Sequence, residues 1–137
     1  MSQIRLIRAP QLSDDVPYAY AARAPGDLVF TAGACPLDAD GDVVHPGDVS
    51  AQADRVMHNL QGALTAAGCS LSDVAKTTVY VASTERADLV AAWEVVRAAF
   101  GDHDAPSTLL GVAVLGYPDQ LVEVEAVAVR PPGAPSA

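Results

Sequence analysis

Two glutamates, Glu123 and Glu125, stand in an otherwise apolar run near the C-terminus, LVEVEAVAV at 121–129. Such a run predicts a β-strand, in which residues i and i+2 share one face at a separation of about 7 Å. If that face is buried, ionised carboxylates are costly unless paired, and buried carboxylates are candidates for acid–base chemistry. The alternative places both at the rim of the sheet, solvated or paired to a cation. Residue chemistry alone slightly favours this alternative.

The other residue types with catalytic potential are scattered along the chain. His45, His58 and His103 each stand apart from any second metal ligand, so we expect no metal site. Cys35 and Cys69 are isolated, which predicts reduced thiols, and Cys35 is typical of a small core hydrophobe. The sequence contains no GxGxxG, P-loop or GxSxG motif, and we expect no cofactor.

The composition argues against several classes of function. The chain has 137 residues, which suits one domain, and its net charge is −9 with only 8 Lys and Arg. Because nucleic-acid binding needs clustered cations, we expect no nucleic-acid partner. The N-terminus has no apolar signal segment, and no apolar run is long enough to span a bilayer. We therefore expect a cytoplasmic protein with no membrane partner.

Apolar periodicity predicts the element order β-β-β-α-β-α-β-β. The predicted strands cover 3–8, 18–24, 28–35, 74–82, 107–115 and 121–129. One helix is predicted from an apolar stripe between Val49 and Ala67, flanked by the capping candidates Asp48 and Gly68. A second helix starts after Ser83 or Thr84 and stops at Gly101. The Pro- and Gly-rich tail 131–137 is predicted to be disordered, which leaves 1–130 as a single domain.

Two helices that alternate with strands should lie on one face of a mixed sheet, giving an α+β fold. In the last strand, the alternate residues Val122, Val124, Ala126 and Ala128 suit packing under the helices. The opposite face is too apolar for a solvated one, since the strand 107–115 is apolar on both sides. This pattern predicts an oligomer. The alternative is that a loop or the N-terminal strands cover the face.

Five segments, in this order, resemble the Rid family, also called YjgF or L-PSP, whose best-known branch is the enamine/imine deaminase RidA. They are PY at 17–18, TAGACPLD at 31–38, AQADRVMHNLQGALTAAG at 51–68, DVAKTTVYV at 73–81 and LVEVEAVAV at 121–129. The resemblance implies a chorismate-mutase-like fold and a homotrimer, with the sheets in a central barrel and small-molecule pockets between subunits. Some members are described as endoribonucleases, an activity that the net charge of −9 argues against.

The resemblance also implies roles for particular residues. Glu123 takes the place of the glutamate that positions the hydrolytic water, Tyr18 that of an aromatic lining the pocket, and Gly33 that of a glycine whose backbone binds substrate. Glu125 is left with a structural role. Ser107 stands where the deaminases have a substrate-binding arginine, whereas alignment on Pro106 puts Thr108 there. In either register the cation is absent.

This departure changes the expected substrate. An arginine binds a carboxylate through two hydrogen bonds, whereas a serine hydroxyl supplies one neutral hydrogen bond, a net gain of about 0.5–1.5 kcal/mol. We therefore expect a substrate that is neutral or held differently, by Tyr18, Ser107 and Tyr117, with Arg23 as the nearest substitute cation. The two hypotheses are an imine or enamine deaminase that lacks the standard 2-aminoacrylate specificity, and a metabolite-binding regulatory trimer without turnover.

Overall fold

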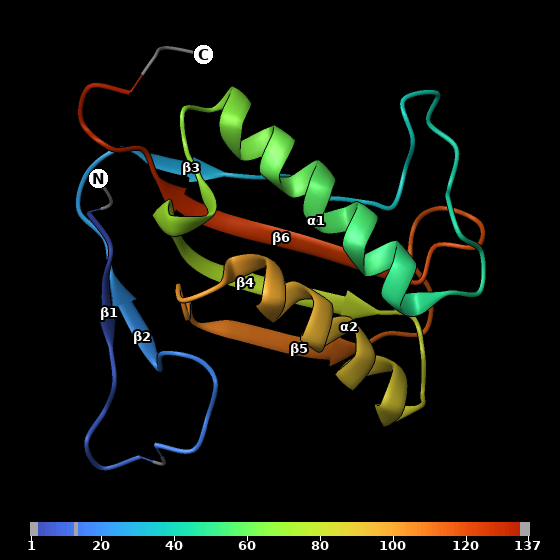
Figure 1. Ribbon diagram of the computed structural model, residues 1–137, viewed down its shortest axis with the longest axis horizontal. Coiled ribbons are helices and arrows are strands. Elements are labelled where there is room, and N and C mark those ends of the chain that lie inside the picture. The colour runs from blue at the N-terminus through green and yellow to red at the C-terminus, as the bar shows by residue number, and fades with distance from the viewer. Residues whose placement is uncertain (1–2, 13, 135–137) are drawn as a thin grey trace.

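The fold is described from a computed structural model in which residues 3–12 and 14–134 are placed (Figure 1). The elements are β1 (Arg5–Ile7), β2 (Ala21–Arg23), β3 (Leu28–Phe30), α1 (Val49–Ala66), the 3-10 turn η1 (Leu71–Asp73), β4 (Val74–Val81), α2 (Arg86–Phe100), β5 (Ser107–Gly111) and β6 (Val122–Val129). Their order is the predicted one, and the α+β class is confirmed. No helix of the described residues is long and apolar enough to cross a membrane.

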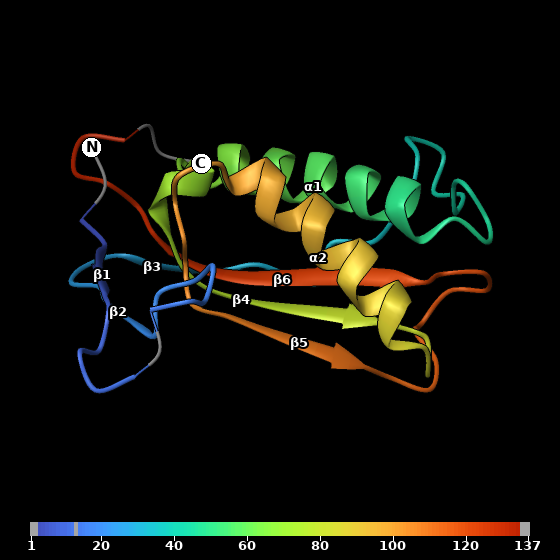
Figure 2. The same cartoon turned by 60° about the horizontal axis from the view of Figure 1, so that its bottom comes forward.

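Four strands form a mixed sheet in the order β3-β6-β4-β5, in which β4 and β5 run parallel and the other pairs antiparallel. Both helices lie on one face of this sheet, as predicted (Figure 2). The strands β1 and β2 form a separate two-stranded ribbon at one end of the sheet. They do not continue into β3 as a meander, because the antiparallel partner of β3 is β6.

The helix α1 begins and ends where its capping residues predict. The side chain of Asp48 accepts a hydrogen bond from the backbone N–H of Ala51 at 3.0 Å, which satisfies one free donor of the first turn. Gly68 follows the last turn with a φ of 82°, a conformation that favours glycine. The second helix starts later than predicted, at Arg86. Ser83 still organises this start, because its hydroxyl donates to Asp88 and accepts from the N–H of Glu85.

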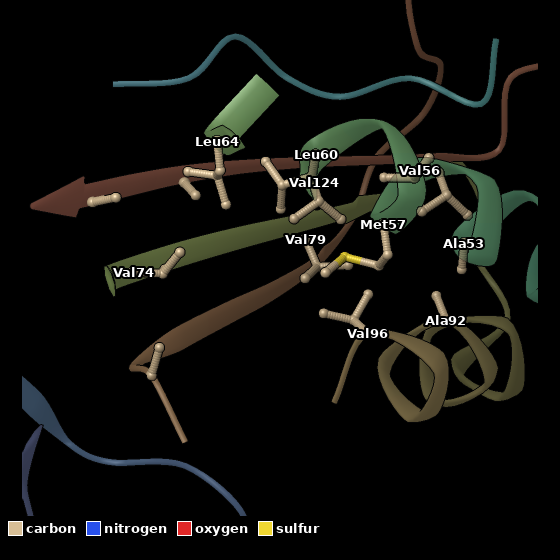
Figure 3. Close-up of a cluster of buried hydrophobic side chains, with 14 of the residues drawn as sticks. Ala53, Val56, Met57, Leu60, Leu64, Val74, Val79, Ala92, Val96 and Val124 are labelled. Atoms are coloured by element: carbon tan, nitrogen blue, oxygen red, sulfur yellow. The ribbon is translucent and has the colours of Figure 1, made fainter. Parts of the chain in front are cut away.

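The core lies between the helices and the sheet (Figure 3). The predicted inward residues of β6 are buried, with Val122, Val124 and Ala128 fully so. Met57 of α1 fills the space between the helices beside Ala92 and Val96 of α2. The side chains that form this core are almost all aliphatic, with α1 packed on β6 and α2 packed on β4 and β5.

The strands β1, β2, β3 and β5 are shorter than the sequence predicts, and a glycine is involved in the shortening of β3 and β5. β5 ends at Gly111, where a Cβ would lie 2.8 Å from the carbonyl oxygen of Ser83, so only glycine lets the chain pass there. Beyond it the chain leaves the ladder and exposes Val114. β3 ends at Phe30, and the ladder with β6 resumes only as an isolated bridge at Ala34.

The sheet face opposite the helices is called the outer face below. It carries Leu28, Phe30, Lys76, Thr78, Tyr80, Thr108, Leu110, Glu123, Glu125 and Val127. Phe30 is 72% exposed, and Leu28 and Leu110 are 47% and 44% exposed, so the N-terminal ribbon does not cover them. An apolar patch of this kind, interleaved with a few polar side chains, is typical of an interface.

The tail beyond β6 is described only in part. Residues 131–134 form a turn in which the N–H of Ala134 donates to the carbonyl oxygen of Pro131 at 3.2 Å. The rest of the segment predicted to be disordered, 135–137, lies outside the described residues.

Candidate functional site

Glu123 lies half-buried on the outer face, and its two carboxylate oxygens have different surroundings. Oε1 accepts a hydrogen bond from Nε2 of Gln120 at 3.0 Å and another from Sγ of Cys35 at 3.4 Å. Oε2 lies over Gly33, so close that a Cβ on that residue would be 2.1 Å away. One oxygen therefore accepts two hydrogen bonds, while the other faces the half-buried backbone of Gly33.

A β-bulge brings Gly33 to this position. Thr31 donates to the carbonyl of Ala126 at 3.0 Å, and Ala34 donates to the carbonyl of Val124 at 2.7 Å. Between these two hydrogen bonds the chain advances three residues, from Thr31 to Ala34, while β6 advances only two. The segment after β3 therefore contains one extra residue, which is a β-bulge. The bulge turns the backbone of Gly33 under the Glu123 carboxylate. The structure thus brings together two of the residues that the sequence singled out.

Tyr117 joins the same group through Gln120. Its N–H donates to Oε1 of Gln120 at 3.1 Å, and Nε2 of Gln120 donates to Glu123. The Tyr117 side chain is itself 46% exposed, so it is available to a ligand on this side of the molecule. Gln120 was not predicted as a site residue, because its position in the turn GYPDQ resembles that of an ordinary polar turn residue.

Cys35 has a different environment from the core position predicted for it. It is half-buried, and its thiol donates to Glu123. Burial raises the pKa of the Cys35 thiol to about 11, with further contributions from the hydrogen bond and the negative charge of Glu123. Cys35 is therefore a protonated hydrogen-bond donor near neutral pH and not a nucleophile.

Glu125, the second glutamate of the pair, accepts a hydrogen bond from the hydroxyl of Tyr80 on the neighbouring strand. This bond is the main cause that raises the pKa of Tyr80, so the phenol keeps its proton. The contacts of the pair within one chain do not decide between the two sequence alternatives. Both glutamates are half-buried, and the side chains that donate to them are neutral, not cationic.

Ser107 belongs to a second group, on the helix side of the sheet. Its hydroxyl oxygen lies 2.6 Å from that of Thr77, which donates to it. A small hollow of about 10 Å³, room for one water, adjoins this pair and is lined by Pro17, Trp93, Arg97, Phe100, His103, Asp104 and Ala105 together with Thr77 and Ser107. Arg97 makes no hydrogen bond or ion pair with the residues that the structure describes.

Tyr18 lies at the same end of the molecule, next to Pro17 of this hollow. Its ring packs edge-on against Tyr20, with centroids 5.8 Å apart. Its carbonyl oxygen accepts from Arg8, which also forms an ion pair with Asp104 at 2.6 Å. This ion pair ties the N-terminal segment to the loop that leads into β5.

Within one chain the two groups do not meet. Ser107 pairs with Thr77 and Glu123 with Tyr80, so they are three residues apart along β4, or about 10 Å. They also lie on different strands and on opposite faces of the sheet. The structure therefore brings Glu123, Gly33 and Tyr117 together but leaves Ser107 and Tyr18 apart from them.

The two alignments place either Ser107 or Thr108 at the position of the missing arginine, and these two residues lie in different parts of the structure. Ser107 adjoins the hollow that Arg97 lines, whereas Thr108 lies on the outer face and accepts from Nζ of Lys76 at 2.6 Å. Burial lowers the pKa of this lysine. Arg23, the substitute considered from the sequence, lies opposite Arg5 in the N-terminal ribbon and does not line the hollow. Arg97 was missed because the sequence does not show that helix α2 turns its side chain toward the hollow beside Ser107.

The described part of the chain contains no group of three or more His, Cys, Asp or Glu side chains that could hold a metal ion.

Comparisons with known proteins identify the family. A family model described as Endoribonuclease L-PSP matches residues 9–130. The chain is 34% identical over 114 residues to a RutC family protein of Pyrococcus abyssi, covering 83% of this chain and 87% of the relative. It is also 34% identical over 112 residues to the 3-aminoacrylate deaminase RutC of Acinetobacter baylyi, covering 82% of this chain and 86% of that protein.

Solved structures agree with this assignment. The Rid family protein YyfB from Yersinia pestis has a TM-score of 0.85 at 29% identity, over 92% of this chain and 98% of that one. E. coli TdcF with bound serine has a TM-score of 0.66 at 31% identity, over 93% and 99% of the two chains. The protein therefore belongs to the Rid family, known also as YjgF or L-PSP, and the resemblance found in its sequence is confirmed.

The close approach of Gly33 and Glu123 can be tested with Gly33→Ala. The added Cβ would overlap the carboxylate, so Glu123 must move away from Gln120 and Cys35, and we expect a loss of about 1–3 kcal/mol in unfolding free energy. Gly62→Ala is the control, since nothing lies within 4 Å of a Cβ there and alanine favours the helix by about 1 kcal/mol. Equal stability of the two variants in urea titrations would contradict the geometry.

The bond between Cys35 and Glu123 can be tested by titrating the thiol through its ultraviolet thiolate absorbance, in a Cys69→Ala background. We expect a pKa of about 11 for Cys35. Adding Glu123→Gln removes the negative charge, so the pKa should fall, while burial keeps it above the ordinary thiol value. A pKa that does not change with Glu123→Gln would show that the two side chains do not interact.

Proposed function

We propose that this protein is a hydrolase that deaminates small imines or enamines in pockets between the subunits of a homotrimer. The observation that carries the proposal is the Glu123 carboxylate, with one oxygen held by Gln120 and Cys35 and the other directed over Gly33. A fixed carboxylate with one open oxygen suits a general base for water. The 3-aminoacrylate deaminase RutC, at 34% identity, supports the same reaction class.

In the proposed reaction, Oε2 of Glu123 takes a proton from a bound water while the water oxygen attacks the carbon of the C=N bond. The electron pair of that double bond moves to nitrogen, which gains a proton from solvent, and a carbinolamine forms. Glu123 then passes the proton that it took from water to the amino group. The C–N bond breaks, ammonia leaves, the hydroxyl proton is lost to solvent, and a carbonyl product remains.

The separation of the two residue groups supports a pocket shared between subunits. Glu123 and Gly33 lie on the outer face. Ser107 lies on the opposite, helix-covered face of the edge strand β5, close to Pro17, the neighbour of Tyr18. If three outer faces pack together as a barrel, Phe30 and Leu110 are removed from water. Glu123 of one copy then meets Ser107 and Tyr18 of a neighbouring copy, which completes the site.

The pocket is proposed to have an altered specificity. The Ser107 hydroxyl already accepts from Thr77, so it can donate a single hydrogen bond to a ligand. Arg97, which makes no hydrogen bond or ion pair with the described residues, lines the adjoining hollow from α2. The pocket therefore suits a neutral imine. It also suits an anionic imine whose charge is bound by the guanidinium of Arg97, which approaches from α2 and not from position 107.

A metabolite-binding trimer without turnover is the second candidate. The absence of a cation at residue 107 favours it, because a reactive 2-imino acid would lose its anchor. Thermal shifts with a metabolite panel separate the two functions. Stabilisation by a ligand that is recovered unchanged supports binding alone, and release of ammonia excludes it.

Glu123→Gln tests the catalytic role. The amide cannot take a proton from water, so we expect kcat on the best imine of a panel to fall by at least about 100-fold. The trimer should persist in native mass spectrometry. Glu125→Gln is the matched control on the same strand and face, bonded to Tyr80, and it should keep kcat within about threefold. Equal turnover by the wild type and Glu123→Gln would exclude Glu123 as the base.

Ser107→Arg tests the altered specificity with imines derived from 2-aminoacrylate. A bidentate bond to the substrate carboxylate is worth about 1.5–3 kcal/mol, so kcat/KM should rise by roughly 10- to 100-fold over a slow wild type. Ser107→Met, which adds bulk without charge, should give no gain. A wild type that is already fast on these substrates would show that residue 107 does not set the specificity.

A further inference from the structure

We propose that Gln120 is a positioning residue that selects which oxygen of Glu123 reacts. The inference rests on the proposed function and deepens it, because it assigns the proton transfer to Oε2. It starts from a buried side chain that the sequence places in a turn, directly before the strand that carries Glu123.

The Gln120 side chain is only 4% exposed, and all of its polar atoms are used. Oε1 accepts from the N–H of Tyr117 at 3.1 Å. Nε2 donates to the carbonyl of Val122 at 3.2 Å and to Oε1 of Glu123 at 3.0 Å. If the Gln120 amide were flipped, its NH2 group would face the N–H of Tyr117, another donor. Its oxygen would then face the carbonyl oxygen of Val122 and the carboxylate of Glu123, both acceptors. The network therefore allows one orientation, with the amide N–H directed at Glu123.

A second buried amide holds the turn that carries Gln120. Gln52 of α1 is fully buried, and its Nε2 donates to the carbonyl of Asp119 at 2.9 Å. Its Oε1 accepts from the N–H of Leu121 at 2.7 Å. The residues on both sides of Gln120 are thus fixed to the helix. Gln120 is a rigid part of the scaffold, although it lies in a connection between strands.

These contacts give the two oxygens of Glu123 separate roles. Oε1 receives hydrogen bonds from Gln120 and Cys35, which stabilise the charged carboxylate and stop its rotation. Oε2, over Gly33, receives no hydrogen bond from the residues that the structure describes and is the oxygen open to water. Gln120 itself has no free polar atom for a substrate. Its loss should therefore lower kcat and leave KM nearly unchanged.

The test compares Gln120→Met and Gln120→Glu with the wild type by steady-state kinetics and crystal structures. Methionine keeps the shape and removes the donor, and glutamate keeps an acceptor for Tyr117 but loses the donor toward Glu123. We expect kcat to fall by at least about 10-fold in both variants, with KM within about twofold. The carboxylate of Glu123 should leave its position over Gly33.

Each other outcome has a distinct meaning. A KM that rises with kcat unchanged would show that Gln120 contacts the ligand, which overturns the inference. So would a Glu123 carboxylate that stays over Gly33 in both variants. A wild type that hydrolyses no imine refutes the proposed function, and the crystal structures then decide separately whether Gln120 positions Glu123. If Gln120→Met does not fold, Gln120→Glu supplies the same comparisons.

Discussion

The close approach of the Glu123 carboxylate to the backbone of Gly33 is the constraint on which the site depends. It requires a residue without a side chain at position 33, a bulge that moves the chain one residue out of step with β6, and donors that stop the carboxylate from rotating. The conditions are met jointly by the segment after β3 and by the turn before β6. The bulge comes from the segment after β3, and the donors come from Cys35 and from the turn before β6.

The core maintains this arrangement from the other side of the sheet. Val122 and Val124 flank Glu123 in β6 and are fully buried beneath the helices, so the strand cannot shift its register without exposing them. The same alternation that buries the valines directs Glu123 outward. A half-buried, charged side chain is thereby held on a face that also exposes Phe30 and Leu110. This combination of exposed apolar side chains and the proposed catalytic carboxylate on one face suits a pocket completed by another subunit.

The order of elements and the buried face of β6 could be predicted from the sequence, because both depend on apolar periodicity. The lengths of β3 and β5 could not, since they end where the backbone meets Glu123 or Ser83, contacts between distant residues. Residue chemistry singled out Glu123 together with Glu125, and the family motifs, which record such contacts, chose Glu123 and added Gly33. Gln120 and Arg97 were missed because no local pattern marks a turn glutamine or a helix arginine as part of a site.

The most direct measurement is the rate at which the wild-type protein releases ammonia from small imines generated in solution, compared with the rate in buffer alone. A panel should pair neutral imines with 2-imino acids of similar size. The account predicts that ammonia and the carbonyl product form together faster than in buffer, with the neutral imines preferred. Rates equal to the buffer rate for every imine would contradict it.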